Sequence, residues 1–241
     1  MERCEYQSYA SAHYVFYFEA GSLAEKRVVD IAQEQERCFD RVCNALGVQF
    51  PKTIQYFLLD SPVKVGKLFG GDLPCNGFAV LGENKIYATY NDDVQCIGFH
   101  EDVHLISAAI CIPKSEFLME GLAMYFDETW WGIDNEIWAG YYKAKAGYSS
   151  VAEMLESRDF YVYDCMISYP VAGAFVKFMI GRYGMVLFLE LYKHPGMEYA
   201  TVFAEIFGAT LEEIEEIFWD EMMKQNVDAG KLEAVLREAL D

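Results

Sequence analysis

The stretch CIGFHEDVHLISAAI, residues 96–110, decides how the whole chain is interpreted. It is mostly apolar, yet it holds two of the chain's four histidines, His100 and His104, four residues apart. In an α-helix this spacing places both imidazoles on one face, one turn apart, so that they can bind the same metal ion. Glu101 follows the first histidine and can reach a water molecule on that ion. The stretch therefore predicts a helix that carries a metal site.

The helix is expected over residues 94–111. Asp92 or Asp93 can act as its N-cap, and Pro113 ends it because proline cannot continue a helix. The histidine pattern also has a plainer interpretation, a polar helix face with two hydrogen-bonded histidines. A third ligand separates the two interpretations, since catalytic zinc is held by three protein side chains.

Glu120 is the candidate for that third ligand. It lies sixteen residues after His104, in the otherwise apolar stretch SEFLMEGLAMYFDE, residues 115–128. An unpaired charge in such a stretch is costly to bury, so it needs a reason to be there. Ser115 can start a second helix, and the turn at Pro113 would return this helix antiparallel to the first, with Glu120 directed at the histidines. The alternative is an exposed glutamate favoured by the helix macrodipole.

The rest of the chain predicts an α+β fold, with the sheet first and the helices after it. The later part also holds a capping box, formed by Thr210 and Glu213. We expect one domain over residues 1–241, with a small mixed sheet in a sheet-rich part, about 1–91, and a mainly helical part, about 92–241. The individual elements expected before the metal helix are a strand within 13–21, a helix over 22–47 that ends on Gly47, a strand over 52–60, and two strands, 77–81 and 85–89, around a turn at 82–84.

Composition limits the possible partners. The formal net charge of -19 argues against nucleic acid and anionic membranes, because both would repel the chain. No apolar run approaches the roughly 20 residues that cross a bilayer, and the first residues lack the pattern of a secretion signal. Seven scattered cysteines without C-x-x-C spacing are expected to be reduced thiols. We therefore expect a cytoplasmic protein, whose oligomeric state stays open.

Three motifs, in this order, resemble a known group of enzymes: HEDVH, FLMEGLAMYF and ISYPVAGAFVKFMIGRYG. The chain is similar to the gluzincin zinc metallopeptidases, and among them to the peptidase MA-like proteins. The resemblance extends to VAEMLESRDF and LEEIEEIFWDEM and covers roughly residues 54–225. It implies a thermolysin-like catalytic fold, a zincin fold in which a pair of helices forms the active site.

The same resemblance implies the roles of individual residues. His100, His104 and Glu120 correspond to the ligands of one zinc ion, and Glu101 corresponds to the catalytic glutamate. Tyr169 corresponds to the tyrosine that stabilises the oxyanion.

Two departures from the family pattern concern these roles. The interval between His104 and Glu120 is shorter than in thermolysin-like enzymes, so the turn between the helices must be tight. Tyr169 is one residue farther from Gly173 than in the related aminopeptidases, and a core tyrosine is an alternative interpretation of it. Tyr161 and Tyr163 are further candidates for the oxyanion donor.

The predicted function is hydrolysis of peptide bonds by zinc-activated water, with a peptide or protein as substrate. Endopeptidase action is preferred, because the exopeptidase motif of aminopeptidases has no counterpart here. The alternative from another class is a non-catalytic, zinc-containing peptide-binding module, and a hydrolase of non-peptide amides is a further possibility.

Asp102 is expected to leave the zinc helix on a different side from the ligands. Several aromatic residues could wall a cleft or belong to the core: Trp130, Trp131, Trp138, Tyr141 and Tyr142.

Overall fold

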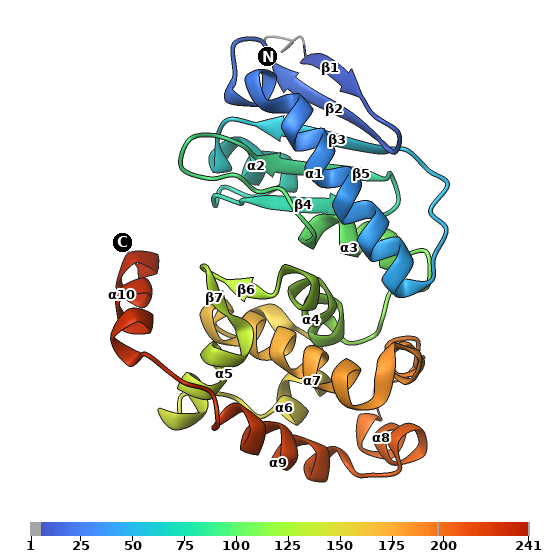
Figure 1. Ribbon diagram of the computed structural model, residues 1–241, viewed down its shortest axis with the longest axis vertical. Coiled ribbons are helices and arrows are strands. Elements are labelled where there is room, and N and C mark those ends of the chain that lie inside the picture. Colours follow the sequence, from blue (N-terminus) through green and yellow to red (C-terminus); the bar gives the residue numbers. More distant parts are fainter. Residues whose placement is uncertain (1–5, 197, 241) are drawn as a thin grey trace. The chain divides into compact units, whose positions relative to one another are not determined.

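A computed structural model describes residues 6–196 and 198–240. The chain separates into two compact units, Met1–Ile110 and Cys111–Asp241. They are drawn from blue to green and from green to red in Figure 1. The first unit carries the larger sheet and the second is mainly helical, which confirms the predicted α+β class.

The sheet of the first unit has five strands in the order β1-β2-β3-β5-β4. Strands β2, β3 and β5 run parallel, while β1 and β4 pair antiparallel at the two edges, so the sheet is mixed as predicted. The elements of this unit are β1 (Tyr6–Ala10), β2 (Tyr14–Glu19), α1 (Leu23–Leu46), β3 (Ile54–Leu59), α2 (Pro62–Phe69), β4 (Gly77–Val80), β5 (Lys85–Thr89) and α3 (His100–Ser107).

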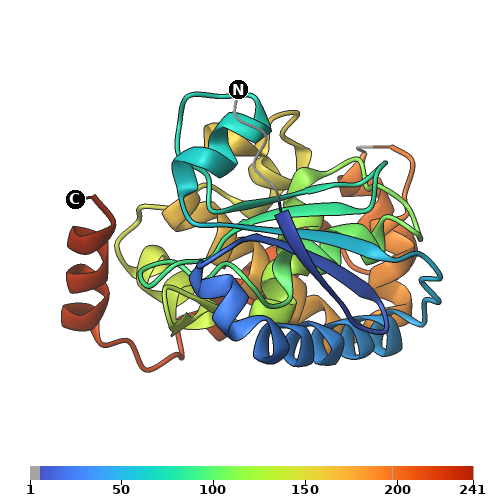
Figure 2. The ribbon, with the colours of Figure 1, turned by 90° about the horizontal axis from the view of Figure 1, so that it is seen from above.

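Helices α1 and α2 lie on opposite faces of this sheet, as the views in Figures 1 and 2 both show. Alternate residues of β2, Tyr14 and Phe16, are fully buried on the α1 side, where Tyr14 meets Phe39 of α1 edge-on. The other face carries a row of stacked aromatic rings with centroids 4.7, 4.8 and 5.0 Å apart. This aromatic row consists of Tyr17, Phe57, Tyr87 and Phe78, one ring from each of four neighbouring strands.

The predicted helix over 22–47 is confirmed, since Ser22 caps α1 by accepting a hydrogen bond from the N–H of Glu25 and Gly47 ends it in the left-handed conformation. Two elements were not expected. Strand β1 is exposed along its whole length and shows no alternation of apolar residues. Helix α2 follows β3 directly, with Ser61 as its cap and Pro62 at its first position.

The predicted start of the metal helix was wrong. Helix α3 begins at His100 rather than at residue 94, and neither Asp92 nor Asp93 caps it. The side-chain oxygen of Asn91 instead accepts hydrogen bonds from the N–H groups of Asp93 and Val94, which holds this segment in a turn. The residue at the N-cap position of α3, Phe99, makes no side-chain capping bond.

The boundary between the two units lies after α3, at residues 110 and 111, whereas the sheet-rich part was expected to end near residue 91. Helix α3 belongs with the sheet because it packs against α1 and β4.

The second unit is built around its longest helix, α7. Helices α4 and α5 pack against α7, and the buried rings of Phe117 and Phe175 meet where α4 and α7 cross. Thr210 and Glu213 form the predicted capping box at the start of α9. The elements are α4 (Glu116–Asp127), β6 (Thr129–Trp130), β7 (Ile133–Asp134), α5 (Asn135–Ala144), α6 (Val151–Glu156), a 3-10 helix η1 (Phe160–Val162), α7 (Cys165–Tyr192), α8 (Tyr199–Phe207), α9 (Leu211–Met222) and α10 (Ala229–Leu240).

The aromatic residues that follow α4 are mostly core residues. Trp138, Tyr141 and Tyr142 are buried and pack with Ile133 and with Leu232 of α10. The ring of Trp138 stacks on that of Tyr142 and its indole N–H donates to a backbone carbonyl. This packing supports the core interpretation of these residues.

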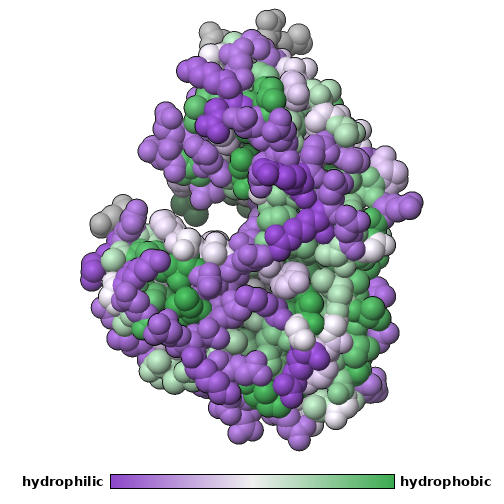
Figure 3. All heavy atoms as spheres, in the orientation of Figure 1, coloured by the Kyte–Doolittle hydropathy of each residue, from purple (hydrophilic) through white to green (hydrophobic). Residues whose placement is uncertain are grey.

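By length and composition, α7 could cross a membrane, and it is the one described helix of which this is true. Half of its most apolar window is buried inside the protein, and its backbone departs from helical geometry at Gly184. In contrast to this apolar helix, most of the molecular face drawn in Figure 3 is hydrophilic.

The six cysteines that the structure describes are thiols rather than disulfides, and Cys4 lies outside the described residues.

Gly121 allows the close approach of α4 to α7. A Cβ atom there would lie 2.7 Å from a methyl group of Val176 and 2.8 Å from the carbonyl oxygen of Ala172. We predict that Gly121→Ala lowers the free energy of unfolding by about 1–3 kcal/mol through overpacking. The control is Gly181→Ala in α7, where nothing lies within 4 Å. It should raise that free energy by about 0.4–1 kcal/mol. Urea unfolding measures both, and equal effects of the two substitutions would contradict the packing described.

Candidate metal centre

His100 and His104 lie one turn apart on α3, as the spacing predicts. Their ring centroids are 4.9 Å apart and the two rings meet edge to face. Both side chains are half-buried. Two neighbouring imidazoles on one helix face are a suitable pair of donors for a metal ion such as zinc.

Glu101 lies between α3 and the edge strand β4. Its side chain is only 8% exposed, although it is a carboxylate. At Gly77, the first residue of β4, a Cβ atom would come 3.0 Å from Glu101 Oε1 and 2.8 Å from the Sγ atom of Cys96. A side chain at position 77 would crowd both groups, so a glycine suits this close approach of the β4 backbone to the carboxylate. This role of Gly77 was not predicted, and the only signal in the sequence is a glycine at the start of a strand.

Asp102 points away from the two histidines, as expected, and is completely buried. Its Oδ2 atom accepts hydrogen bonds from the Tyr14 hydroxyl at 2.5 Å and from Gln35 Nε2 at 3.0 Å. Burial raises the pKa of Asp102 well above its ordinary value, and these two hydrogen bonds only partly oppose the rise. The partners come from β2 and α1, far away in the sequence, which is why sequence analysis missed them.

In the second unit, Glu120 lies on α4 and is 4% exposed. The Tyr161 hydroxyl donates to Glu120 Oε1 at 2.7 Å. Tyr161 belongs to η1, and its ring lies beside that of Phe160. The buried carboxylate thus has a hydrogen-bond donor that holds one of its oxygens in place.

The three tyrosines considered as oxyanion donors have different surroundings. Tyr169 on α7 stacks on Trp130, with centroids 5.3 Å apart, and lies 5.6 Å from Phe160. The hydroxyl of Tyr163 is directed at the carbonyl of Glu153. Tyr161 is the one whose hydroxyl donates to Glu120, and the assignment of the oxyanion donor to Tyr169 stays a prediction.

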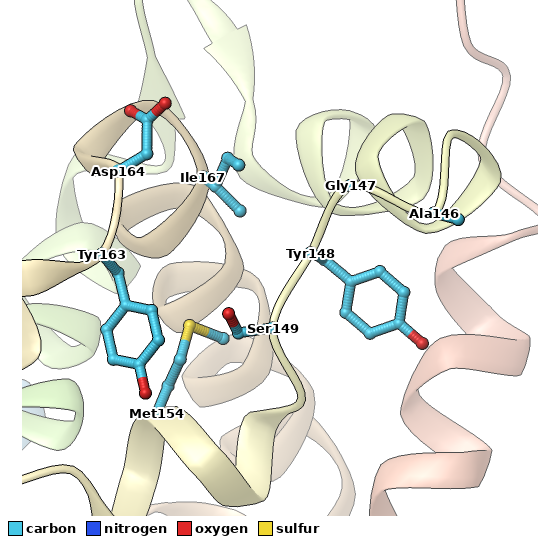
Figure 4. Close-up of a pocket in the computed structure, with 8 residues that line it drawn as sticks. All are labelled: Ala146, Gly147, Tyr148, Ser149, Met154, Tyr163, Asp164 and Ile167. Carbon is cyan, nitrogen blue, oxygen red and sulfur yellow. The ribbon is translucent and has the colours of Figure 1, made fainter.

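A separate pocket of about 260 Å³ lies in the second unit, between the end of α5 and the start of α7 (Figure 4). The ring of Tyr148 turns away from it, toward Trp219, and Asp164 caps α7. This pocket holds no histidine, so it does not suit a transition metal. Its lining residues are Ala146, Gly147, Tyr148, Ser149, Met154, Tyr163, Asp164 and Ile167.

The other two histidines have hydrogen-bond partners outside the candidate metal site. His13 Nδ1 lies 2.6 Å from Glu36 Oε2, and its ring stacks on Phe39. His194 Nδ1 accepts a hydrogen bond from the N–H of Gly196. Among the described residues, neither belongs to a group of three or more side chains that could hold a metal ion.

The donor chemistry of the predicted ligands suits zinc. His100, His104 and Glu120 each offer one ligand atom, two imidazole nitrogens and one carboxylate oxygen in total. This donor set is one that catalytic zinc uses, and it leaves a coordination position open for water. Comparison with known protein families matches no family model to this chain, and comparison with curated protein sequences finds no match.

Proposed function

We propose that this protein is a zinc-dependent metallopeptidase of the gluzincin type, with a thermolysin-like catalytic fold, and that it cleaves peptide bonds within a chain. The observation that carries the proposal is the arrangement on α3. There, two histidines share one helix face, and a buried glutamate between them faces the backbone of an edge strand at Gly77.

His100, His104 and Glu120 are the proposed ligands of one zinc ion. The histidines lie at the first and fifth positions of α3 and the glutamate is in α4, and the eight residues 108–115 connect these helices. A connection this short favours antiparallel neighbours, which supports the joining of the three side chains by one ion. The Tyr161 hydroxyl would keep the Glu120 carboxylate oriented for binding.

A zinc ion bound there would polarise a substrate carbonyl and acidify a water molecule. Glu101 is the proposed general base, which takes the proton of the attacking water and passes it to the leaving nitrogen. Its low exposure suits this task, because a carboxylate shielded from solvent interacts more strongly with a proton nearby. Tyr169 is the proposed donor to the oxyanion, with Tyr161 as the alternative.

The position of β4 at the edge of the sheet supports an extended peptide as the substrate. Among the described strands, β4 pairs with β5 and lies at the edge of the sheet, a position where another strand could add. An extended peptide can add to such an edge by main-chain hydrogen bonds. Because Gly77 lies against Glu101, a peptide on β4 would run past the proposed general base.

The ligand set predicts metal content. Untagged protein purified without chelator should contain about one zinc ion per chain, and His104→Ala and Glu120→Ala should each lose most of it. His194→Ala is the matched control and should keep the native content, because among the described residues His194 belongs to no group that could hold a metal ion. Elemental analysis measures all four proteins. A native chain that takes up no zinc even from excess metal would refute the proposal.

The role of Glu101 predicts a loss of hydrolysis without a loss of metal. Glu101→Gln should cleave peptides about 10²–10⁴-fold more slowly, because the amide cannot accept the proton. Its zinc content should match that of the native protein. Glu205→Gln, at an exposed carboxylate on α8, should behave as native. Zinc binding without hydrolysis of any peptide in a broad library would favour the alternative, a zinc-containing peptide-binding module.

The close approach of the β4 backbone to Glu101 at Gly77 predicts an effect of substitution on the rate of hydrolysis. Gly77→Ala should slow peptide hydrolysis by at least about tenfold, because its methyl group would displace the Glu101 carboxylate, and a displaced catalytic group loses much of its effect. Zinc content should not change. Gly82→Ala, in the turn between β4 and β5, meets nothing within 4 Å and serves as the control. Equal rates for the two variants would show that the close approach does not matter.

A further inference from the structure

A buried polar cluster connects α3 to β2 and α1 in the first unit. It consists of Tyr14 on β2, Gln35 on α1 and Asp102 on α3, and all three residues are 0% exposed. The Tyr14 hydroxyl and Gln35 Nε2 both donate to Asp102 Oδ2, at 2.5 and 3.0 Å. The other carboxyl oxygen, Asp102 Oδ1, is buried without a hydrogen-bond partner among the described residues.

Gln35 also holds the segment that leads into α3. Its Oε1 atom accepts from the N–H of Gly98 at 2.7 Å, and its Nε2 atom donates to the carbonyl of the same residue at 3.0 Å. Gly98 has φ +122, which favours glycine, and lies two residues before the helix begins. Phe99, at the N-cap position, makes no side-chain capping hydrogen bond, and Gln35 supplies a restraint just before the helix.

The position of Asp102 connects this cluster to the histidines. Each residue of an α-helix is rotated by about 100° from the one before it, so Asp102 faces away from both His100 and His104. Hydrogen bonds that fix Asp102 therefore fix the rotation of α3 about its axis, and with it the direction of the two imidazoles. An apolar residue at 102 would bury as well and cost less, because a buried carboxyl group is expensive.

We propose that Tyr14, Gln35 and Asp102 are positioning residues of the zinc site, and that they hold α3 at the rotation in which both histidines present a nitrogen to the same ion. This inference rests on the proposed function. It assigns no contact with metal or substrate to the three residues, which act through the helix.

The test uses the full chain with cobalt(II) in place of zinc, because the visible absorption of cobalt reports the geometry of its ligands. Tyr14→Phe should weaken cobalt binding about 10–100-fold, the range typical when a group that orients a ligand is removed, and should change the absorption bands. Tyr17→Phe is the matched control. It makes the same substitution on the same strand, but in the aromatic row on the other face of the sheet, and should keep the native affinity and spectrum.

Two substitutions of Asp102 separate positioning from general stability. Asp102→Asn keeps an acceptor oxygen for Tyr14 and Gln35 and should retain a native cobalt spectrum. Asp102→Val removes the acceptor and should alter the spectrum and weaken binding. Urea unfolding of each variant shows whether the protein is folded under the conditions of the titration. Should Tyr14→Phe or Asp102→Val fail to fold, Gln35→Met repeats the test, because it removes the bonds to Gly98 and Asp102 at similar side-chain length.

The outcomes are distinguishable. If the native chain binds neither cobalt nor zinc, the proposed function itself is wrong. If the native chain binds cobalt and the folded variants Tyr14→Phe, Asp102→Val and Gln35→Met share its affinity and spectrum, the zinc site stands and the positioning role is overturned.

Discussion

The cost of burying carboxyl groups is the constraint on which the rest of this structure depends. Glu101, Asp102 and Glu120 are each at most 8% exposed, and an isolated charge in such surroundings is unfavourable by several kcal/mol. For Asp102 and Glu120, the fold supplies hydrogen-bond donors from other elements. Tyr14 and Gln35 donate to Asp102, and Tyr161 donates to Glu120. At Glu101, the proposed general base, the backbone of β4 comes close to the carboxylate at Gly77.

The hydrogen-bond donors to the buried acids come from parts of the chain far from those acids in the sequence. Asp102 is separated from its partners by 88 and 67 positions, and Glu120 from Tyr161 by 41. The elements that bring them together are ordinary ones, a parallel strand with alternating buried residues and helices with one apolar face. Each buried acid meets a polar side chain from such an element: Tyr14 of β2 and Gln35 of α1 at Asp102, and Tyr161 of η1 at Glu120.

Sequence patterns predicted the local features and missed those that depend on packing. Helical spacing correctly put His100 and His104 on one face, and the alternation in β2 revealed a strand. The start of α3 was predicted wrongly because Asp92 and Asp93 resemble caps, whereas the neighbouring Asn91 draws them into a turn. Neither the role of Gln35 nor that of Gly77 has a local signature, since each is defined by a contact with a residue more than twenty positions away. The thermolysin-like arrangement remains a proposal for the same reason.

The aromatic row lies on the α2 side of the sheet, and it has a consequence for the α1 side. Phe78 of β4 stacks on Tyr87 of β5, while Gly77, one position earlier, faces Glu101. Successive side chains of a strand point to opposite faces, so a slip of β4 by one residue would bring the bulky Phe78 ring against the carboxylate and withdraw the glycine. By resisting that slip, the stacked rings on the other face keep Gly77 beside the Glu101 carboxylate. The strand register is thus itself a component of the proposed catalytic apparatus.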